Sequence, residues 1–157
     1  MIVATVEDMV GATAAARDHL TLNLRRAPRT EGQPVPTHES RWIGHLRRIG
    51  AAKLRLWGLP WLVDDAQVVI SELVTNALLH GTGDQIAFRL LLVGDFCVLE
   101  VGDGSPQPAR ISEADALDEN GRGMFIVSAL TSLCGVSPDG TKTWCTFTIP
   151  PSPRRTA

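Results

Sequence analysis

The 157-residue chain lacks any long hydrophobic run and has only three cysteines. No segment reaches the roughly 18 to 20 consecutive apolar residues that a membrane-spanning helix requires. The first residues carry Glu7 and Asp8 where a secretory signal peptide would be basic, so we expect a cytoplasmic protein. Cys97, Cys134 and Cys145 are odd in number and show no C-x-x-C spacing, so neither a disulfide framework nor a zinc site is expected.

The overall composition is that of a soluble globular protein. Apolar residues make up 44% and charged residues 20% of the chain, which excludes wholesale disorder. Although the formal net charge is only −2, residues 17–55 carry nine basic and three acidic side chains, and residues 64–120 carry two basic and eleven acidic ones. The basic segment lacks the glycine-rich or aromatic-interleaved pattern of nucleic-acid binders. We therefore expect solvated arginines on helix faces and no nucleic-acid partner.

The N-terminal segment is expected to stand outside the main domain. Apolar residues between Met9 and Leu24 recur near helical spacing, which predicts a weak helix over residues 8–26. Three prolines and a glycine in residues 27–39 indicate a linker. The predicted division is an N-terminal extension and linker over residues 1–36, one domain over residues 37–150, and a C-terminal tail over residues 151–157.

Hydrophobic periodicity predicts the remaining elements. They are helices over residues 41–57, 61–80 and 122–133, strands over residues 85–93, 96–103 and 141–150, and a long loop over residues 104–120. Gly81 should end the second of these helices in the left-handed conformation. This order predicts an α+β fold, a two-layer sandwich with helices packed on one face of a mixed, mostly antiparallel sheet.

The helix predicted over residues 61–80 carries the first candidate functional residues. Glu72, Asn76 and His80 are spaced four residues apart, so their side chains share one helix face over two turns. A carboxylate can accept a proton from a nucleophile, and an amide oxygen can ligate a hard cation such as Mg²⁺. An exposed polar helix face would show the same spacing, which leaves both interpretations open.

A second candidate, VGDGSP, places Asp103 at the end of a predicted strand and Ser105 in the turn that follows. Such an aspartate can accept a hydrogen bond from the exocyclic amino group of adenine, worth about 1.5–3 kcal/mol. The GRG sequence at residues 121–123 directly precedes a predicted helix, where backbone N–H groups bind phosphate. The TKT sequence at residues 141–143 opens the last strand, where a hydroxyl can bond a base or Asp103. The alternatives are an ordinary turn and a solvent-facing strand start.

The order and spacing of these motifs resemble the ATP-binding fold shared by gyrase, heat-shock chaperones, sensor histidine kinases and mismatch-repair ATPases. The resemblance rests on four motifs, SELVTNALLHG, VGDGSP, GRGMFIV and GTKTW, and it covers roughly residues 40–150. The sequence is most similar to the compact branch of this superfamily, the bacterial anti-sigma-factor serine kinases. The resemblance implies the histidine-kinase-like ATPase fold, with ATP and Mg²⁺ as cofactors.

The resemblance also implies a role for each matching position. Glu72 is then the general base, Asn76 the Mg²⁺ ligand, Asp103 the adenine-specificity residue, Gly121 and Gly123 the backbone at the phosphates, and Thr143, or alternatively Thr141, a helper at the adenine end. Ser105 and Arg122 complete the expected nucleotide contacts. A divalent cation matters because an ATP tetraanion beside Glu72 and Asp103 would otherwise be repelled.

Two departures from the family pattern concern catalysis. Ser105 and Gln107 occupy positions where the family has glycines, which predicts either a weaker grip on the nucleotide or a differently set lid. No arginine stands just before Gly121, so a cation for the γ-phosphate would have to come from Arg122, Arg110 or Lys142. Because positioning and charge neutralisation supply nearly all phosphoryl-transfer catalysis, a missing cation would cost orders of magnitude in rate.

Three functions remain open. The first is a serine/threonine kinase that phosphorylates an antagonist protein and sequesters a sigma factor, and the resemblance adds a homodimer. The second is a catalytically weak or inactive ATP-gated module that binds a partner protein. The third is a histidine-kinase fragment, suggested by the H-E-x-R pattern at His38, but His38 lies too close to Asn76 for a dimerisation hairpin to precede the ATP-binding domain.

Overall fold

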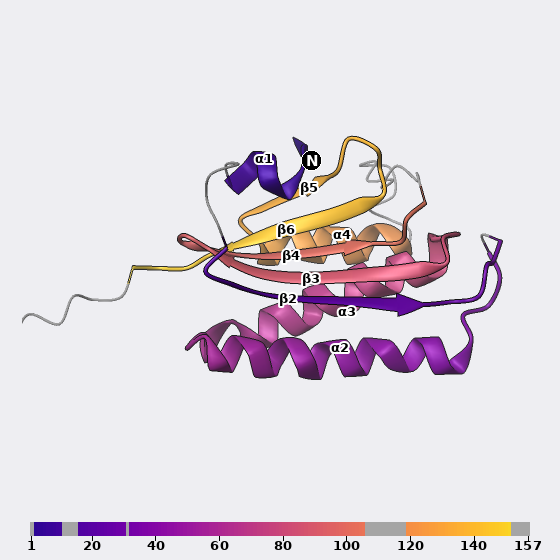
Figure 1. Ribbon diagram of the computed structural model, residues 1–157, viewed down its shortest axis with the longest axis horizontal. Coiled ribbons are helices and arrows are strands. Elements are labelled where there is room, and N and C mark those ends of the chain that lie inside the picture. The colour runs from indigo at the N-terminus through magenta and orange to yellow at the C-terminus, as the bar shows by residue number, and fades with distance from the viewer. Residues whose placement is uncertain (1, 11–15, 31, 106–118, 152–157) are drawn as a thin grey trace, which may run out of the picture.

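The computed structural model describes residues 2–10, 16–30, 32–105 and 119–151. The strands in this part of the chain form one six-stranded sheet in the order β1-β5-β6-β4-β3-β2 (Figure 1). Their bounds are β1 (Ile2–Val3), β2 (Asp18–Arg25), β3 (Gln85–Val93), β4 (Phe96–Gly102), β5 (Leu133–Val136) and β6 (Lys142–Thr148). The β1–β5 pair is parallel and all other neighbours are antiparallel, so the sheet is mixed and mostly antiparallel, as predicted.

Three long helices cover one face of this sheet. They are α2 (Thr37–Leu56), α3 (Val63–His80) and α4 (Glu119–Leu130), and the short 3₁₀ helix η1 (Pro60–Leu62) joins α2 to α3 (Figure 1). The predicted α+β sandwich with helices on one face is confirmed. The small helix α1 (Val6–Val10) lies on the opposite face.

The α2–α3 hairpin is specified locally. Pro60 stands at the start of η1, where a backbone N–H would have no partner within the helix. Asp64 and Asp65 lie in the first turn of α3, where their negative charges interact favourably with the positive end of the helix dipole. Gly50 of α2 faces Ile70 of α3, and a Cβ at Gly50 would come within 2.7 Å of the Ile70 side chain. This glycine therefore lets the two helices pack closely along their length.

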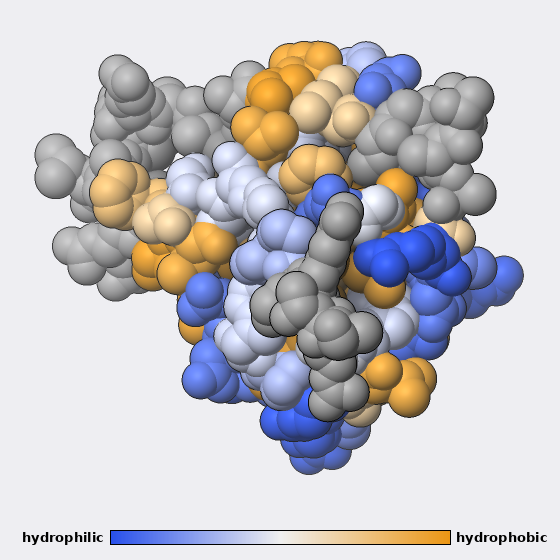
Figure 2. All heavy atoms as spheres, turned by 90° about the vertical axis from the view of Figure 1, so that its left-hand side faces the viewer, coloured by the Kyte–Doolittle hydropathy of each residue, from blue (hydrophilic) through white to orange (hydrophobic). Residues whose placement is uncertain are grey.

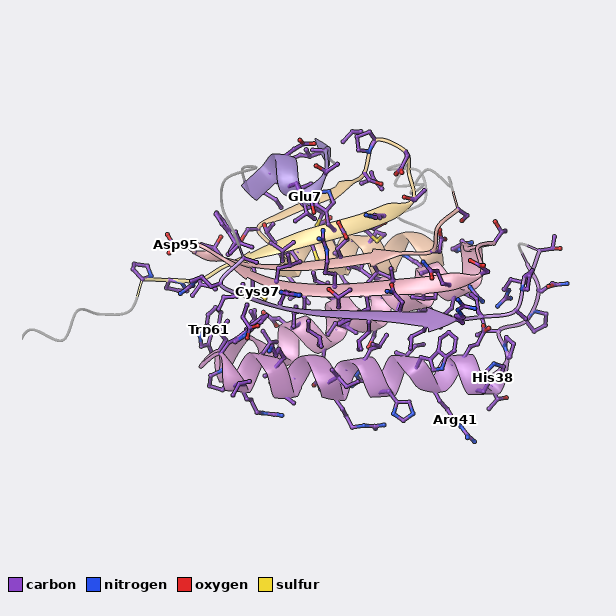
Figure 3. The ribbon with its side chains drawn as sticks, viewed as in Figure 1. Glu7, His38, Arg41, Trp61, Asp95 and Cys97 are labelled. Carbon is purple, nitrogen blue, oxygen red and sulfur yellow. The ribbon has the colours of Figure 1, made fainter. Side chains whose placement is uncertain are left out.

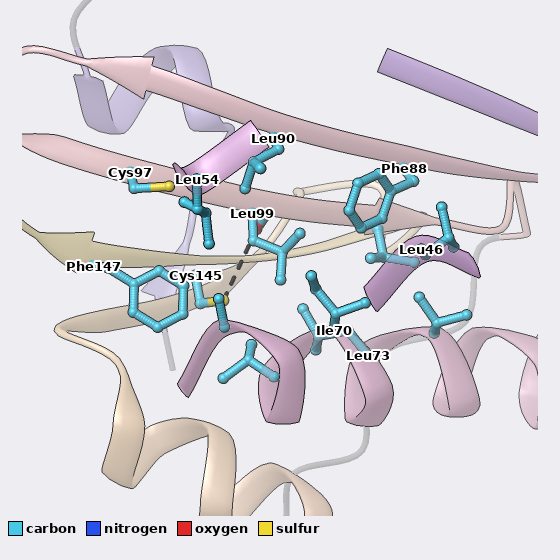
Figure 4. Packing of buried hydrophobic residues seen from close by; sticks show 14 of the residues in the cluster. Leu46, Leu54, Ile70, Leu73, Phe88, Leu90, Cys97, Leu99, Cys145 and Phe147 are labelled. Atoms are coloured by element: carbon cyan, nitrogen blue, oxygen red, sulfur yellow. Dashed lines mark hydrogen bonds between the residues drawn. The ribbon is translucent and has the colours of Figure 1, made fainter. Parts of the chain in front are cut away.

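The main core lies between the helices and the sheet. Figure 4 shows side chains from α2 and α3 packed against alternate residues of β3, β4 and β6. The labelled members are Leu46, Leu54, Ile70, Leu73, Phe88, Leu90, Cys97, Leu99, Cys145 and Phe147. Burial raises the pKa of the Cys97 thiol to about 12, so this cysteine is a small hydrophobic residue, as expected.

A smaller core covers part of the other sheet face. Val6 of α1 packs there against Leu91, Val98 and Trp144, which alternate with the residues that face the main core. The buried Trp144 indole donates a hydrogen bond from Nε1 to the Ala4 carbonyl at 2.7 Å. The N-terminal strand and helix are thus anchored to the far face of the sheet.

The N-terminal segment corrects the sequence analysis. The helix predicted over residues 8–26 is wrong, because Asp18–Arg25 forms the edge strand β2 and pairs antiparallel with β3. Strand β1 pairs with β5 at the opposite edge, so the segment expected as an extension contributes to both edges of the sheet. The helix predicted over residues 122–133 instead spans Glu119–Leu130, and the strand β5 that follows it was not predicted.

The ends of the molecule differ in what they carry. The β3–β4 turn at Asp95 and the side chain of Trp61 lie at one end, whereas His38 and Arg41 lie at the other, near the end of β2 (Figure 3). Figure 2 looks at the Asp95 end and shows hydrophobic residues in separate groups among hydrophilic ones. None of the described helices is both long and apolar enough to cross a membrane.

Candidate nucleotide-binding site

Helix α3 is the element on which the candidate site is built. Its buried positions, which include Ile70, Leu73 and Val74, face the core and fix how the helix is rotated. Glu72 and Asn76 lie one turn apart and are half-buried. Neither side chain makes a hydrogen bond or ion pair within the described part of the chain, so both carry polar groups that are available to a ligand.

Glu72 lies directly against Gly123 of α4. A Cβ built on Gly123 would meet Glu72 Oε2 and would lie 3.2 Å from Glu72 Cδ. The missing side chain at Gly123 therefore makes room for the Glu72 carboxylate. The structure brings these two predicted site residues together, although they are 51 positions apart in the sequence.

The glycines of GRG are placed differently from the prediction. Helix α4 begins at Glu119, so Gly121 and Arg122 lie in its first turn and Gly123 lies further inside the helix. The backbone N–H groups of the first four helical residues have no partner within a helix, and Gly121 belongs to this set but Gly123 does not. The GRG sequence thus lies inside the helix and not directly before it, and the closeness of Gly123 to Glu72 gives a reason for this glycine.

Asp103 lies at the other end of the site, against the end of α3. A Cβ on Gly81 would meet Asp103 Oδ2 and the Ala77 carbonyl, and would lie 2.6 Å from Asp103 Cβ. Gly81 has φ −71° and ψ 135°, so the predicted left-handed conformation is wrong. Glycine is needed here for the close approach of Asp103, and a Cβ on Gly83 would likewise meet the Asp103 carbonyl.

Ser105 holds the Asp103 side chain in place. The Ser105 backbone N–H and hydroxyl each donate a hydrogen bond of 2.8 Å to Asp103 Oδ1. Ser105 is buried, and its hydroxyl oxygen also accepts a bond from the Thr82 N–H at 3.4 Å. Oδ1 is therefore occupied, and Oδ2 is the oxygen that remains for a ligand. The serine at the family's glycine position thus orients Asp103.

The two threonines of the TKT sequence, Thr141 and Thr143, make different contacts. The Ser137 hydroxyl donates to Asp139 Oδ1 at 2.6 Å, and the Thr141 backbone N–H and hydroxyl donate to the same oxygen at 3.1 Å and 2.8 Å. These hydrogen bonds lower the pKa of Asp139 from 3.8 to about 2. The Thr141 carbonyl accepts a hydrogen bond from the Asp103 N–H at 3.3 Å. Thr143 pairs with Val101 in the β4–β6 ladder.

Strand register shows which face of the sheet Thr143 lies on, while the Thr141 hydroxyl is bonded to Asp139. Residues opposite one another in antiparallel strands point to the same face, and residues two apart along a strand do so as well. Val101 and Cys145 belong to the main core on the helix side, so Thr143, which lies opposite Val101, faces that side too. Its half-buried side chain is diagonal to Asp103, and whether Thr143 or Thr141 helps to bind the base stays a prediction.

Three charged residues near the end of α3 were not predicted from the sequence to be part of the site. Arg26, at the end of β2, and Glu39, in the first turn of α2, are buried and form an ion pair of 2.8 Å, and Arg29 approaches the same carboxylate at 3.6 Å. The expectation that the arginines of residues 17–55 are solvated is wrong for Arg26 and Arg29. No local pattern identifies them, because their partners are distant in the sequence.

Several predicted contacts fall outside the described residues. They are Gln107 and Arg110, together with the Arg122 side chain and most of the loop expected over residues 104–120. Lys142 is described and exposed at the start of β6. The source of a cation for the γ-phosphate therefore stays a prediction.

The two ends of the candidate site are separated along helix α3. Gly81 follows Glu72 by nine residues, which is about 13 Å along the axis of a helix that rises 1.5 Å per residue. Asp103 and Thr143 flank the far end of this stretch, and Glu72 and Gly123 flank its beginning. The floor of the site is thus long enough for an extended ligand with two different ends.

A comparison with protein families matches residues 38–147 to the model of the histidine kinase-like ATPase domain. The chain belongs to this family. A search of curated proteins finds no match for the chain. Membership in the histidine kinase-like ATPase family implies that the protein binds ATP, and the match contains Glu72, Asn76, Asp103, Gly123 and Thr143.

The residues present fit a magnesium-bound adenine nucleotide. No group of three or more His, Cys, Asp or Glu side chains that could hold a metal ion by itself occurs among the described residues. Mg²⁺ is usually held by one or two protein oxygens together with substrate phosphates and water. The unpaired amide of Asn76 suits such a site, and the free Asp103 Oδ2 suits a base that presents an amino group.

Proposed function

We propose that the protein is a Mg·ATP-dependent regulatory kinase that phosphorylates a serine or threonine of an antagonist protein. The proposal is supported by membership in the histidine kinase-like ATPase family and by the similarity of its motifs to anti-sigma-factor kinases. The observation that carries it is the position of Glu72 against Gly123, because this places a carboxylate without a hydrogen-bonding partner beside the first turns of α4. When the antagonist is absent, the protein binds a sigma factor and acts as a homodimer.

In this proposal, the adenine end selects the nucleotide. Asp103 accepts a hydrogen bond at Oδ2 from the exocyclic amino group of adenine, while Ser105 keeps Oδ1 occupied. The amino group at this position of adenine is a donor, whereas guanine has an acceptor there, so a carboxylate favours ATP over GTP. Thr143 contributes its hydroxyl from the neighbouring strand.

At the other end, Glu72 takes the proton from the hydroxyl of the protein substrate as that oxygen attacks the γ-phosphorus. The bond between the γ-phosphorus and the bridging oxygen breaks, and ADP leaves with that oxygen. Asn76 holds Mg²⁺ through its amide oxygen, and backbone N–H groups in the first turn of α4, including that of Gly121, bind phosphate oxygens. The bound Mg²⁺ supplies charge neutralisation of the triphosphate. The acidic composition of residues 64–120 makes this neutralisation necessary.

The experiment is a phosphotransfer assay with γ-labelled ATP and candidate antagonist proteins. Glu72→Gln keeps the size of the side chain but cannot take up a proton, so we expect phosphotransfer to fall about 10²-fold or more while ATP binding persists. Asp64→Asn, an exposed change in the first turn of the same helix, is the matched control and should behave like the wild type. Equal phosphotransfer by wild type and Glu72→Gln would rule out the role of Glu72.

The second candidate is an ATP-gated binding module without turnover. It is favoured by the Asp103 turn, where Ser105 takes the place of a family glycine and strengthens the hold on the base rather than the chemistry. Such a module would bind ATP tightly, lose this binding in Asp103→Asn, and release no phosphate over hours. Measurement of phosphate release by the purified protein distinguishes the two candidates.

The histidine-kinase fragment is not favoured. Helix α2, which begins at Thr37 and carries His38, packs along α3 as part of the ATP-binding domain. The neighbouring Glu39 is buried in its ion pair with Arg26. Acid-labile phosphate on His38 would nevertheless be direct evidence for this function.

A further inference from the structure

The buried side chain of Arg26 joins three elements at the adenine end of the site. Arg26 follows β2, its Nη2 donates to Glu39 Oε2 of α2 at 2.8 Å, and the same nitrogen donates to the Leu78 carbonyl of α3 at 3.1 Å. Its Nη1 reaches the carbonyls of Ala77 at 3.3 Å and Gly81 at 3.5 Å. The guanidinium is fully buried, so its position is fixed by these partners.

These contacts make Arg26 a cap for the C-terminal end of α3. The last carbonyls of a helix have no partner within the helix and carry a partial negative charge, which a cation stabilises. The flat guanidinium presents its donors as a fork and can hold several carbonyls at once, whereas a lysine ammonium cannot match this geometry. Arg26 therefore determines where the chain leaves α3, at Gly81.

Glu39 and Arg29 complete the cluster, and within the described part of the chain neither forms a hydrogen bond to α3. Glu39 is buried and its carboxylate accepts from Arg26, while Arg29 Nη1 lies 3.6 Å from the same carboxylate. The Arg29 Nη2 donates to the Gln33 carbonyl, within the segment that leads to α2. Arg26 and Arg29 thus share Glu39, but among the described residues it is Arg26 that donates to the carbonyls at the end of α3.

Gly81 is the link between this cluster and the base-binding carboxylate. Its carbonyl accepts from Arg26, and its Cα faces Asp103 so closely that a Cβ would meet Asp103 Oδ2. A shift of Gly81 toward or away from Asp103 would therefore change the space beside Oδ2. Asp103 Oδ1 is held separately by Ser105, so the position of Gly81 acts on the oxygen that is left for the ligand.

We propose that Arg26 is a positioning residue for adenine recognition, which it serves by fixing Gly81 against Asp103. This inference rests on the proposed binding of adenine at Asp103. Arg26 lies outside residues 38–147, the part of the chain that matches the family. The segment ahead of the family domain thus tunes the nucleotide selectivity of the site.

The test compares Arg26→Gln with Arg29→Gln as a matched control, because both changes remove a cation from Glu39 but only Arg26 contacts the α3 carbonyls. Dissociation constants for ATP and GTP with Mg²⁺ are measured by calorimetry for each variant, and thermal melting reports its folded state. Arg26→Lys is included because it keeps the buried charge without the fork, so a folded variant is available if the glutamine variant does not fold. Both Arg26 changes are also made in the Asp103→Asn background.

We expect Arg26→Gln to weaken ATP binding about tenfold and to leave the weak GTP binding unchanged, because guanine gains nothing from Asp103. Arg26→Lys should lie between Arg26→Gln and the wild type. Arg29→Gln should change neither constant by more than about twofold, and neither Arg26 change should weaken ATP binding further in Asp103→Asn.

Equal losses for ATP and GTP, equal effects of Arg26→Gln and Arg29→Gln, or full additivity with Asp103→Asn would overturn the positioning role. Absence of ATP binding by the wild-type protein would instead contradict the proposed function itself. The two failures are therefore distinguishable in one set of titrations.

Discussion

The two ends of the candidate site differ in how firmly their side chains are held. At the adenine end, Asp103 Oδ1 is bonded twice by Ser105, and the carbonyls that end α3 are capped by Arg26. At the phosphate end, Glu72 and Asn76 have no hydrogen bond to a described residue. The Glu72 carboxylate lies against Gly123, which has no side chain to hold it. One end is ordered before a ligand arrives, whereas the other presents polar groups that still lack partners.

This contrast suggests a division of work between the two ends. A preorganised acceptor loses little entropy on binding and so supplies affinity and selectivity for the base. Half-buried polar groups without partners gain their bonds only when cation and phosphates are present, so their contribution depends on the ligand's charge. We therefore expect changes at the adenine end to alter binding and changes at the phosphate end to alter turnover.

The largest effect is expected from Gly123→Ala at the phosphate end. The new methyl group would collide with Glu72 Oε2, and because this is the tip of a flexible side chain, the carboxylate would move aside at little cost in stability. ATP turnover should fall about 10²-fold, since a displaced general base loses most of its contribution, while the dissociation constant for ATP changes little. Unchanged turnover in a steady-state assay would contradict the predicted role of this contact.

Gly81→Ala at the adenine end should give the opposite pattern. Its backbone conformation suits alanine, but the methyl group would meet the Ala77 carbonyl and lie 2.6 Å from Asp103 Cβ, so backbone atoms would have to shift. We expect a loss of about 1–3 kcal/mol in the free energy of unfolding and about tenfold weaker ATP binding. Denaturant titration and calorimetry measure the two effects.

Gly44→Ala is the control for both glycine variants. A Cβ at Gly44 makes only an ordinary contact of 3.8 Å with Arg48, on helix α2. It should leave binding and turnover unchanged and should not destabilise the protein, because alanine favours helices. A loss of ATP binding in Gly44→Ala would mean that the site responds to any change in the helical layer, and the comparison of its two ends would fail.

Ser105→Ala should have a smaller effect. The variant loses the hydroxyl bond to Asp103 Oδ1 but keeps the backbone N–H bond to the same oxygen. A hydrogen bond of this kind contributes about 0.5–1.5 kcal/mol, so ATP binding should weaken about two- to tenfold without a change in GTP binding. Fluorescent-nucleotide displacement measures this; tighter ATP binding in the variant would show that Ser105 competes with the base for Asp103.

The smallest effect is expected from Asp18→Asn, which lies outside both ends. Asp18 Oδ2 accepts bonds from Trp57 Nε1 and Lys53 Nζ, each at 2.9 Å, and this bonding lowers the pKa of Asp18 to about 2. The pKa is depressed from 3.8, so the carboxylate's contribution to stability is present above pH 3.8 and lost as the pH falls toward 2.

Asp18→Asn should therefore lose less stability than the wild type between pH 4 and 2, with ATP binding at neutral pH unchanged. Thermal melting across this pH range measures the difference. Identical pH dependence of the two proteins would mean that the bonds from Trp57 and Lys53 do not stabilise the ionised form.

Strong local patterns allowed much of the fold to be predicted from the sequence. The strand predicted over residues 85–93 has the same bounds in the structure, because alternating apolar residues and the Gly94 turn specify it locally. Helix α3 was predicted within two residues, since proline and acidic residues mark its start. The structure brings Glu72 and Gly123 together, two of the residues that the resemblance assigned to one site.

The remainder depended on contacts that no local pattern reveals. The leucines of β2 alternate strictly at Leu20, Leu22 and Leu24, but wider spacings that include Met9 also fit a helix, and only pairing with β3 decides between them. Strand β5 is too short to show a period of its own. The burial of Arg26 and Glu39 follows from the meeting of β2, α2 and α3, which a single sequence does not display.

The most direct test of the central claim is a calorimetric titration of Mg·ATP and Mg·GTP into the wild type and Asp103→Asn. We expect the wild type to bind ATP with clear preference over GTP, and Asp103→Asn to lose this preference through about 10- to 100-fold weaker ATP binding. Equal affinity of both proteins for ATP, or no binding of ATP by the wild type at millimolar concentration, would contradict the account.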